Sequence, residues 1–158
     1  MTGSSHFDAA GNARMVDVSG KEPNDRTATA KARVVMSQET LATIAGGAAK
    51  KGDVLAVARL AGIMAAKQTS QLIPLCHPLS LTSVTVDLVC DAVESAVDIT
   101  ATCRVRERTG VEMEAMTAAA ITALTVYDMC KSLDRGMRIE AIRLVHKSGG
   151  SSGTFEAD

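Results

Sequence analysis

Two stretches of alternating side chains, joined by a short polar turn, constrain the fold of this chain more than any other feature of its sequence. Residues 96–106 place apolar side chains in one row and polar ones in the other: Val97, Ile99, Ala101, Cys103 and Val105 against Asp98, Thr100, Thr102, Arg104 and Arg106. Residues 81–90 alternate too, with Val84, Val86, Leu88 and Cys90 on one side. Alternation with a period of two is typical of half-buried strands. We therefore predict a hairpin that turns at residues 91–95.

Helix signals flank this hairpin on both sides. Ser37 is a good N-cap for a short helix, and Asp53 can cap a second, alanine-rich helix that runs to about Gln71. Residues 111–132 form a long apolar pattern without an internal glycine or proline, which favours a third helix. The small side chains of the second helix would allow a neighbouring element to approach closely.

Two further strands complete the predicted order. Residues 29–36 can form a first strand, and residues 137–147 a last one whose imperfect alternation indicates a bulge or an interface edge. If the first two helices count as one crossover, the order is β-α-β-β-α-β. The sequence thus predicts an α+β, ferredoxin-like fold, a four-stranded antiparallel sheet with helices packed on one face.

Length and polarity predict one domain over residues 15–147, with a flexible N-terminal arm (1–14) and a flexible Gly/Ser-rich tail (148–158). Aromatic residues make up only 2% of the 158, so the core must come from Ala, Val, Leu, Ile and Met. The outer row of the hairpin has no ring on which a base could stack, which argues against an RNA-binding sheet. A net charge of −1 argues against a polycation that binds DNA or anionic lipid. We expect a cytoplasmic protein without nucleic-acid or membrane partners.

Three places carry side chains capable of chemistry. A connector stiffened by two prolines presents Leu75, Cys76 and His77, and the histidine either reacts or fixes the turn. The long helix begins with Glu112, Met113 and Glu114. The two carboxylates there either interact favourably with the helix dipole or contact a substrate. Near its end, Asp128 and Lys131 lie three residues apart and share a face, either as a surface ion pair or as a proton-transfer pair.

Basic residues recur at the ends of the predicted elements. Scattered lysines are usually solvated, but converging ones could bind a phosphorylated anion; the residues concerned are Lys51, Lys67, Arg104 and Lys147. The backbone of the tail at 148–153 could wrap a phosphate, or remain disordered. The four cysteines form no C-x-x-C pair and no further ligand lies near His77, so we expect no metal site.

Taken together, these segments resemble the MoaC family of molybdenum cofactor biosynthesis. The similarity rests on MVDVSGK at 15–21, KGDVLAVARLAGIMAAK at 51–67, LIPLCHPL at 72–79, TGVEMEAMTAA at 109–119, ALTVYDMCK at 123–131 and RLVHKSGG at 143–150. It covers nearly all of the chain after the arm. The tail reads SGGSSG where relatives often have a lysine at the position of Ser151, which weakens the expected phosphate contact there.

The resemblance implies a cyclic pyranopterin monophosphate synthase, a lyase. Its substrate would be 3′,8-cyclo-7,8-dihydro-GTP, made by a radical S-adenosylmethionine enzyme, and pyrophosphate would be released. The family works without an organic cofactor, with magnesium at most accompanying the triphosphate. It forms homohexamers, trimers of dimers, with active sites at subunit interfaces.

By position, the resemblance assigns catalysis to Asp128, Lys131 and Lys51. It assigns substrate binding to Leu75, Cys76, His77, Glu112, Met113, Glu114, Lys67 and Lys147, with Arg104 as an addition. Ring opening and reclosure need repeated proton transfers, which lysines could perform if burial or like charge lowered a pKa. A non-catalytic small-molecule-binding module of the same fold is the alternative, and it would tolerate loss of Lys51 and Lys131.

Overall fold

Residues 6–158 are described by a computed structural model, and their central element is β1 (Asn24–Val35). It pairs antiparallel with β3 (Ala96–Glu107) on one side and β4 (Arg138–Ser148) on the other. β2 (Ser83–Asp91) and β5 (Phe155–Glu156) add the edges, in the order β2-β3-β1-β4-β5. Without β5, this is the antiparallel strand order that the predicted β-α-β-β-α-β arrangement requires.

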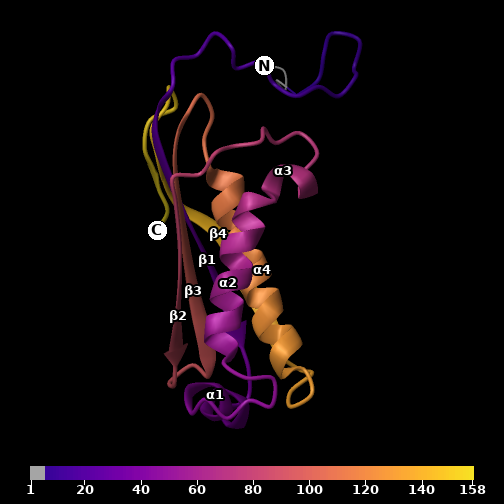
Figure 1. Cartoon of the computed structure of the whole chain (residues 1–158), viewed down its shortest axis with the longest axis vertical. Helices are drawn as coiled ribbons and strands as arrows, with labels where there is room; N and C mark the ends of the chain where they lie inside the picture. Colours follow the sequence, from indigo (N-terminus) through magenta and orange to yellow (C-terminus); the bar gives the residue numbers. More distant parts are fainter. Residues whose placement is uncertain (1–5) are drawn as a thin grey trace.

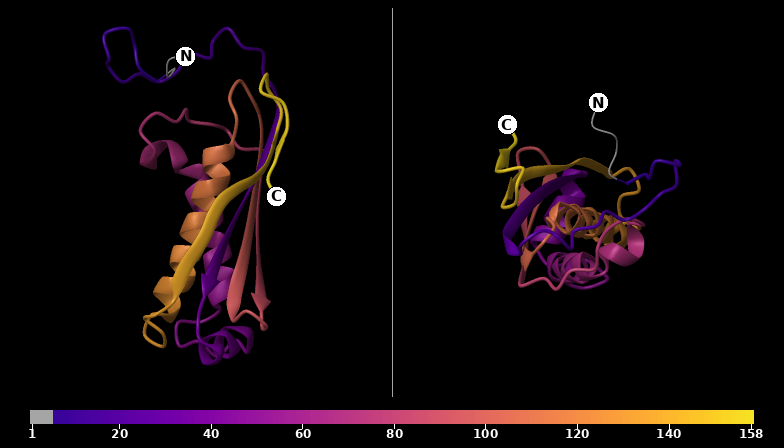
Figure 2. Two further views of the ribbon diagram at one scale, coloured as in Figure 1. Left: turned by 180° about the vertical axis from the view of Figure 1, so that it is seen from behind. Right: turned by 90° about the horizontal axis from the view of Figure 1, so that it is seen from above.

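Helices cover one face of the sheet (Figures 1 and 2). α2 (Val54–Lys67) and α4 (Glu112–Cys130) run side by side along it, and α1 (Gln38–Ala45) lies at one end of the molecule. The short α3 (Thr69–Leu72) lies at the other end, followed by the connector with the two prolines. The predicted α+β class and the one-sided helix layer are confirmed.

The core lies between the sheet and this helix layer and uses small aliphatic side chains. β1 contributes every second residue to it, namely Ala28, Ala30, Ala32 and Val34, all nearly inaccessible to solvent. The row predicted for β3 is buried as expected. Because alanine and valine fill little space, the helices must lie close to the sheet and to each other to leave no voids.

Gly62 shows how close α2 and α4 come. A Cβ atom at this position would lie 2.1 Å from the Thr122 hydroxyl oxygen and 3.1 Å from the Ala118 carbonyl oxygen. Only glycine therefore fits there without moving α4. The small residues of α2 do allow close approach, as the sequence suggested.

The caps of the first two helices are those expected. The Ser37 side chain accepts a hydrogen bond from the Thr40 amide, and the Asp53 side chain accepts one from the Ala56 amide. α2 is shorter than predicted, because its helix ends at Lys67 and a separate turn, α3, follows.

The sheet differs from the prediction in two places and agrees with it in a third. β1 begins at Asn24 rather than Thr29, because its polar first residues also pair with β3. β4 has the expected bulge, with shifted register opposite β1 and a positive φ of 53° at Ala141. The sheet has five strands rather than four, since β5 in the tail pairs with the end of β4.

The tail has two further contacts with β4. The Glu156 carboxylate contacts the His146 ring at 2.5 Å, and Arg143 donates to the main-chain oxygen of Asp158. The flexibility of the tail and of the arm stays a prediction, and the first five residues of that arm lie outside the described part. Within residues 6–158, no helix combines the length and the hydrophobicity needed to cross a membrane.

Candidate active site

A cavity of about 380 Å³ lies at the N-terminal end of α4. Its walls come from the start of α4, from the connector after α3 and from the segment 15–21, which passes over it. Six predicted substrate-binding residues line it: Leu75, Cys76, His77, Glu112, Met113 and Glu114. The structure thus brings together two of the three motifs that the sequence singled out.

Glu114 is the most buried charged residue of this cavity. Its side chain projects from the first turn of α4, and the residue is 4% exposed. Burial, with a smaller contribution from the negative charge of Glu112, raises the pKa of Glu114 to about 7. Near neutral pH this carboxyl group therefore exists in both forms and can either donate or accept a hydrogen bond.

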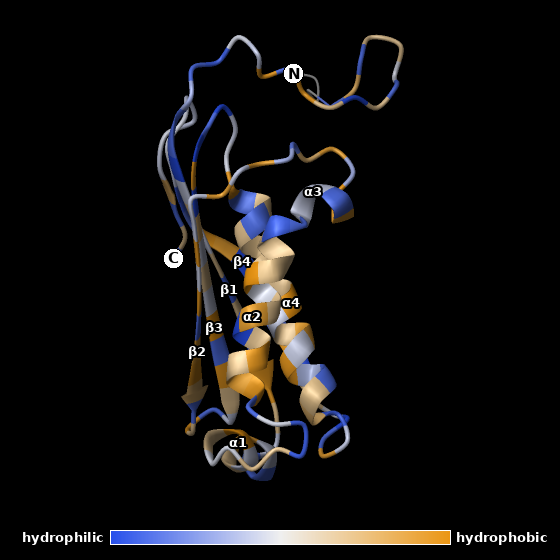
Figure 3. Cartoon of the chain, in the orientation of Figure 1, coloured by the Kyte–Doolittle hydropathy of each residue, from blue (hydrophilic) through white to orange (hydrophobic). Residues whose placement is uncertain are grey.

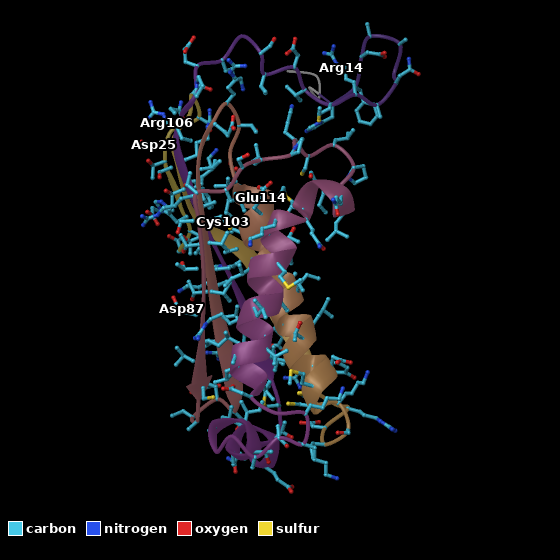
Figure 4. The ribbon with its side chains drawn as sticks, in the orientation of Figure 1. Arg14, Asp25, Asp87, Cys103, Arg106 and Glu114 are labelled. Atoms are coloured by element: carbon cyan, nitrogen blue, oxygen red, sulfur yellow. The ribbon has the colours of Figure 1, made fainter. Side chains whose placement is uncertain are left out.

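The cysteines near Glu114 remain thiols. Figure 4 shows Glu114 at the upper end of the helix layer with Cys103 of β3 nearby. Burial and the Glu114 charge raise the pKa of Cys103 to about 12, and the same two causes raise the pKa of Cys76. Because the thiolate is the reactive form of cysteine, neither residue is suited to act as a nucleophile here.

His77 connects the connector to the segment 15–21. Its Nε2 atom lies 2.7 Å from the carbonyl oxygen of Val16. A carbonyl oxygen can only accept, so Nε2 carries the proton and Nδ1 is the free ring nitrogen when the ring is neutral.

Lys147 reaches the edge of the cavity from β4. Its Nζ atom lies 3.1 Å from the Glu112 carboxylate and donates to the Ser152 hydroxyl at 2.6 Å. The chain can turn here because Gly149 and Gly150 have positive φ angles of 93° and 81°. A Cβ atom at Gly149 would lie 2.3 Å from the Asp25 carbonyl oxygen, and one at Gly150 would lie 2.3 Å from the Arg26 guanidinium.

Arg26 is a residue that the sequence analysis missed. Its guanidinium donates from Nε to the Glu107 carbonyl at 2.9 Å and from Nη2 to the Arg108 carbonyl at 3.1 Å. It thereby ties the start of β1 to the end of β3, beneath the turn that follows Lys147. The only available signal was a charged residue just before the predicted first strand.

The two remaining basic candidates lie apart from this cavity. Lys67, at the end of α2, lines a neighbouring hollow of about 360 Å³ that shares Leu79 with the cavity. Arg104 lies in the exposed row of β3, and its carbonyl accepts a hydrogen bond from the Thr82 amide at 2.9 Å. The Arg104 side chain lines neither hollow, and its role in binding stays a prediction.

The predicted catalytic residues gather at the opposite end of α4. The Asp128 carboxylate lies between two ammonium groups, with Lys131 Nζ at 2.7 Å and Lys51 Nζ at 3.4 Å. Lys51 also donates to the Asp128 carbonyl oxygen at 3.1 Å. We call Asp128, Lys131 and Lys51 the ion triad. Lys51 comes from the loop between α1 and α2, so the triad joins residues that are 77 positions apart.

The charges of the triad stabilise one another's ionised forms. Hydrogen bonds from Lys131 and Lys51 lower the pKa of Asp128, and the hydrogen bond to Asp128 raises the pKa of Lys131. The sequence analysis made proton transfer by lysine conditional on a lowered pKa, and in a single chain the raised pKa of Lys131 does not meet that condition. The reason is exposure: about half of each triad side chain is open to solvent, and desolvation is too weak to oppose the carboxylate.

The loop after α4 makes hydrogen bonds that hold the end of this helix near the triad. The Asp134 carboxylate accepts a hydrogen bond at 2.8 Å from the Ser37 amide at the start of α1. The Tyr127 hydroxyl donates to the Arg135 carbonyl at 3.1 Å. These contacts connect the end of α4 to α1, which leads into the loop that carries Lys51.

Comparison with known proteins shows the family to which the chain belongs. Residues 15–150 match the model of the MoaC family. The chain belongs to the MoaC family. It is 60% identical to a protein from Dinoroseobacter shibae over the full length of both chains. It is 59% identical over 155 residues to one from Rhodospirillum rubrum, covering 98% of this chain and 93% of that one. Both relatives are named cyclic pyranopterin monophosphate synthase.

In this MoaC-family chain, the cavity and the ion triad are separate. Glu112 and Asp128 lie sixteen residues apart on α4, which at 1.5 Å per residue corresponds to about 24 Å. One small substrate cannot touch both ends of α4 in the same chain. The structure therefore divides the predicted site into two half-sites.

Neither half-site offers a cage for a resident metal ion. Across residues 6–158, no three His, Cys, Asp or Glu side chains gather closely enough to hold one. Magnesium, expected only as a companion of the substrate's triphosphate, stays a prediction.

Proposed function

We propose that this protein is a cyclic pyranopterin monophosphate synthase of molybdenum cofactor biosynthesis. The names of its relatives at about 60% identity support the activity. The observation that carries the proposal is the Asp128 carboxylate between two lysines from separate elements. A module that only binds a ligand has no need of such an arrangement of proton donors and an acceptor, and this favours the enzyme over the binding module.

The substrate in this proposal is 3′,8-cyclo-7,8-dihydro-GTP, supplied by a radical S-adenosylmethionine enzyme. Lys131 and Lys51 move protons while the purine ring opens and the pyranopterin ring closes, and Asp128 holds them and relays protons. A ribose-derived hydroxyl oxygen then bonds to the α-phosphorus as the bond from that phosphorus to the bridging oxygen of the β-phosphate breaks. The hydroxyl proton passes to a base, and pyrophosphate leaves.

The cavity at the start of α4 would hold the base of the substrate. His77 and Glu114 orient it, because a carboxyl group and an imidazole can match its N–H and carbonyl groups. Leu75, Cys76 and Met113 would enclose it, with Glu112 beside them. Lys147, Lys67 and Arg104 would bind the phosphates and stabilise the pyrophosphate that leaves.

Because the two half-sites are about 24 Å apart, we propose that each complete site combines the cavity of one chain with the ion triad of another. A two-fold pair of chains with antiparallel α4 helices would bring unlike ends together. A surface for this contact is available between the half-sites: Val57, Leu60 and Met64 of α2 and Leu124 of α4 are about half exposed. Figure 3 displays the hydrophobic residues along these two helices. Three such pairs would make the homohexamer.

The first experiment measures pyrophosphate release from 3′,8-cyclo-7,8-dihydro-GTP by the wild type and by Lys131→Ala, with Arg138→Ala, an exposed residue outside both half-sites, as control. We expect release by the wild type and the control only. A folded, oligomeric wild type that releases none would refute the synthase and favour the binding module.

A second experiment tests the shared site. Lys131→Ala and Glu114→Ala chains, each inactive alone, are unfolded together and refolded as a mixture. If sites form between chains, about a quarter of them combine two intact halves, and activity returns to that level. If both halves served the same chain, the mixture would stay inactive.

A further inference from the structure

Two residues that line the cavity, Thr109 and Gly110, have no role in the proposed function. Of the two, Gly110 is the more informative, because a glycine marks a place where the chain needs either an unusual backbone or free space. Its φ angle is not positive, in contrast to those of Gly149 and Gly150. An alanine could therefore adopt the backbone at this position, and what Gly110 provides is space.

The Glu112 side chain occupies this space. A Cβ atom at Gly110 would lie 2.0 Å from one carboxylate oxygen of Glu112, 2.8 Å from the carboxyl carbon and 2.9 Å from the other oxygen. Glu112 therefore folds back over the residue two positions before it. An alanine at position 110 would collide first with the end of this flexible side chain, so it would displace the carboxylate and leave the backbone in place.

The contacts of Glu112 show what this displacement would break. Its carboxylate lies 3.1 Å from Lys147 Nζ, and the two side chains are only 29% and 22% exposed. Partial burial strengthens such a pair, because less water surrounds the charges. No side chain caps the start of α4, so the carboxylate also lies where it interacts favourably with the positive end of the helix dipole. Glu112 thus has one defined position between α4 and the end of β4.

We propose that Gly110 is a positioning residue for the reaction, because the space beside it keeps the Glu112 carboxylate against Lys147 and at the wall of the cavity. This inference rests on the proposed function, in which Glu112 contacts the substrate. From this position the carboxylate can accept hydrogen bonds from N–H groups of the substrate. Gly110 touches no reacting atom and acts only through Glu112.

The kinetic test compares Gly110→Ala with Gly136→Ala. Gly136 is a matched control, because its φ angle is not positive either and a Cβ atom there would lie at an ordinary contact distance, 3.4 Å, from the Asp134 carboxylate. Losing a hydrogen bond to a charged group corresponds to about a 10- to 100-fold change in affinity. We expect KM for 3′,8-cyclo-7,8-dihydro-GTP to rise by about tenfold in Gly110→Ala, with kcat within about twofold of the wild type. An active Gly110→Ala enzyme with the KM of the control would overturn the inference.

The same substitution in a Glu112→Ala chain shows whether Gly110 acts through Glu112. Once the carboxylate is gone, an alanine at position 110 has nothing to displace, so Gly110→Ala should raise KM no further. A second rise of about tenfold in this background would overturn the inference, because Gly110 would then act through the shape of the cavity or through the backbone.

Crystal structures of the wild type and of Gly110→Ala without substrate separate this inference from the proposed function, because they need no turnover. In the variant we expect the Glu112 carboxylate to lie more than about 4 Å from Lys147 Nζ, beyond the limit of an ion pair. A retained contact would overturn the inference even in an active synthase. A displaced carboxylate would support the positioning of Glu112 even if neither protein released pyrophosphate, a result that would refute the synthase alone.

Discussion

Each end of α4 carries a functional carboxyl group, but the surroundings of the two groups differ. At its N-terminal end, Glu114 is buried, its pKa is raised to about 7, and a cavity is already formed around it. At its C-terminal end, Asp128 is exposed, its pKa is lowered, and its partners are two lysines rather than apolar groups. Desolvation raises the pKa of Glu114, whereas the neighbouring lysines lower the pKa of Asp128.

This difference shows that the cavity is formed within a single chain, whereas the ion triad stays open to solvent. The cavity has walls on several sides and needs only a ligand. The ion triad is open to water, which weakens its electrostatic interactions. Covering it with a second chain or with substrate would exclude water and so strengthen these interactions.

The largest effect is expected from Asp128→Asn. This change keeps the shape of the side chain but removes the charge that holds both lysines. If the triad transfers protons, kcat should fall by about 10²- to 10⁴-fold, with a smaller change in KM. Steady-state kinetics against Glu140→Gln, a surface carboxylate on β4, provide the measurement, and equal activity of the two variants would remove Asp128 from the mechanism.

Glu114→Gln tests the buried end through stability. Because the pKa of Glu114 is higher in the folded protein, ionisation in the unfolded chain costs stability as the pH rises from about 4.5 to about 7. The glutamine variant should match the wild type at pH 4 and be more stable at pH 8, by up to about 3 kcal/mol. Denaturant titrations at the two pH values would show this, and a pH-independent difference would contradict it.

Leu60→Asp addresses the contact proposed between chains. Leu60 is 58% exposed in the single chain, so the substitution should leave its fold intact. Burying the new charge at an interface would weaken association by about tenfold or more. Light scattering should then report smaller assemblies, and activity should fall in parallel. Asp87→Asn, on the exposed row of β2, is the control, and an unchanged hexamer would place the interface elsewhere.

The smallest effect is expected from Asp134→Ala, which removes the contact between the loop after α4 and the start of α1. Losing a hydrogen bond at a helix N-terminus costs about 1 kcal/mol or less at an exposed position. The Ser37 amide lowers the pKa of Asp134, so this stability is present above about pH 4 and is lost in stronger acid. Thermal melts at pH 7 and pH 3 should therefore differ in how far the variant lies below the wild type.

Short-range sequence patterns correctly predicted the elements that depend on neighbouring residues, namely the hairpin and two helix starts. The alternation at 96–106 and the caps at Ser37 and Asp53 gave the hairpin and both helix starts, because each depends on neighbouring residues. The early start of β1 and the added β5 depend on pairing with distant strands, which no local pattern encodes.

The site was predictable to a similar extent. Periodicity on α4 indicated that Asp128 and Lys131 share a face, but only the fold brings Lys51 to them. The resemblance supplied the list of residues without their division between two ends of a helix. Arg26 escaped notice because its importance comes from the turn at Gly149 and Gly150 that folds over it.

The hydroxyl contact of Tyr127 has a practical consequence for spectroscopy. The chain has one tyrosine and no tryptophan, so its ultraviolet fluorescence comes mainly from a single ring. That ring precedes Asp128 directly in the sequence, and its hydroxyl is bonded to the Arg135 carbonyl. The unlabelled protein therefore carries its own optical reporter, and emission changes during subunit mixing or ligand addition would come from the end of α4 that carries the ion triad.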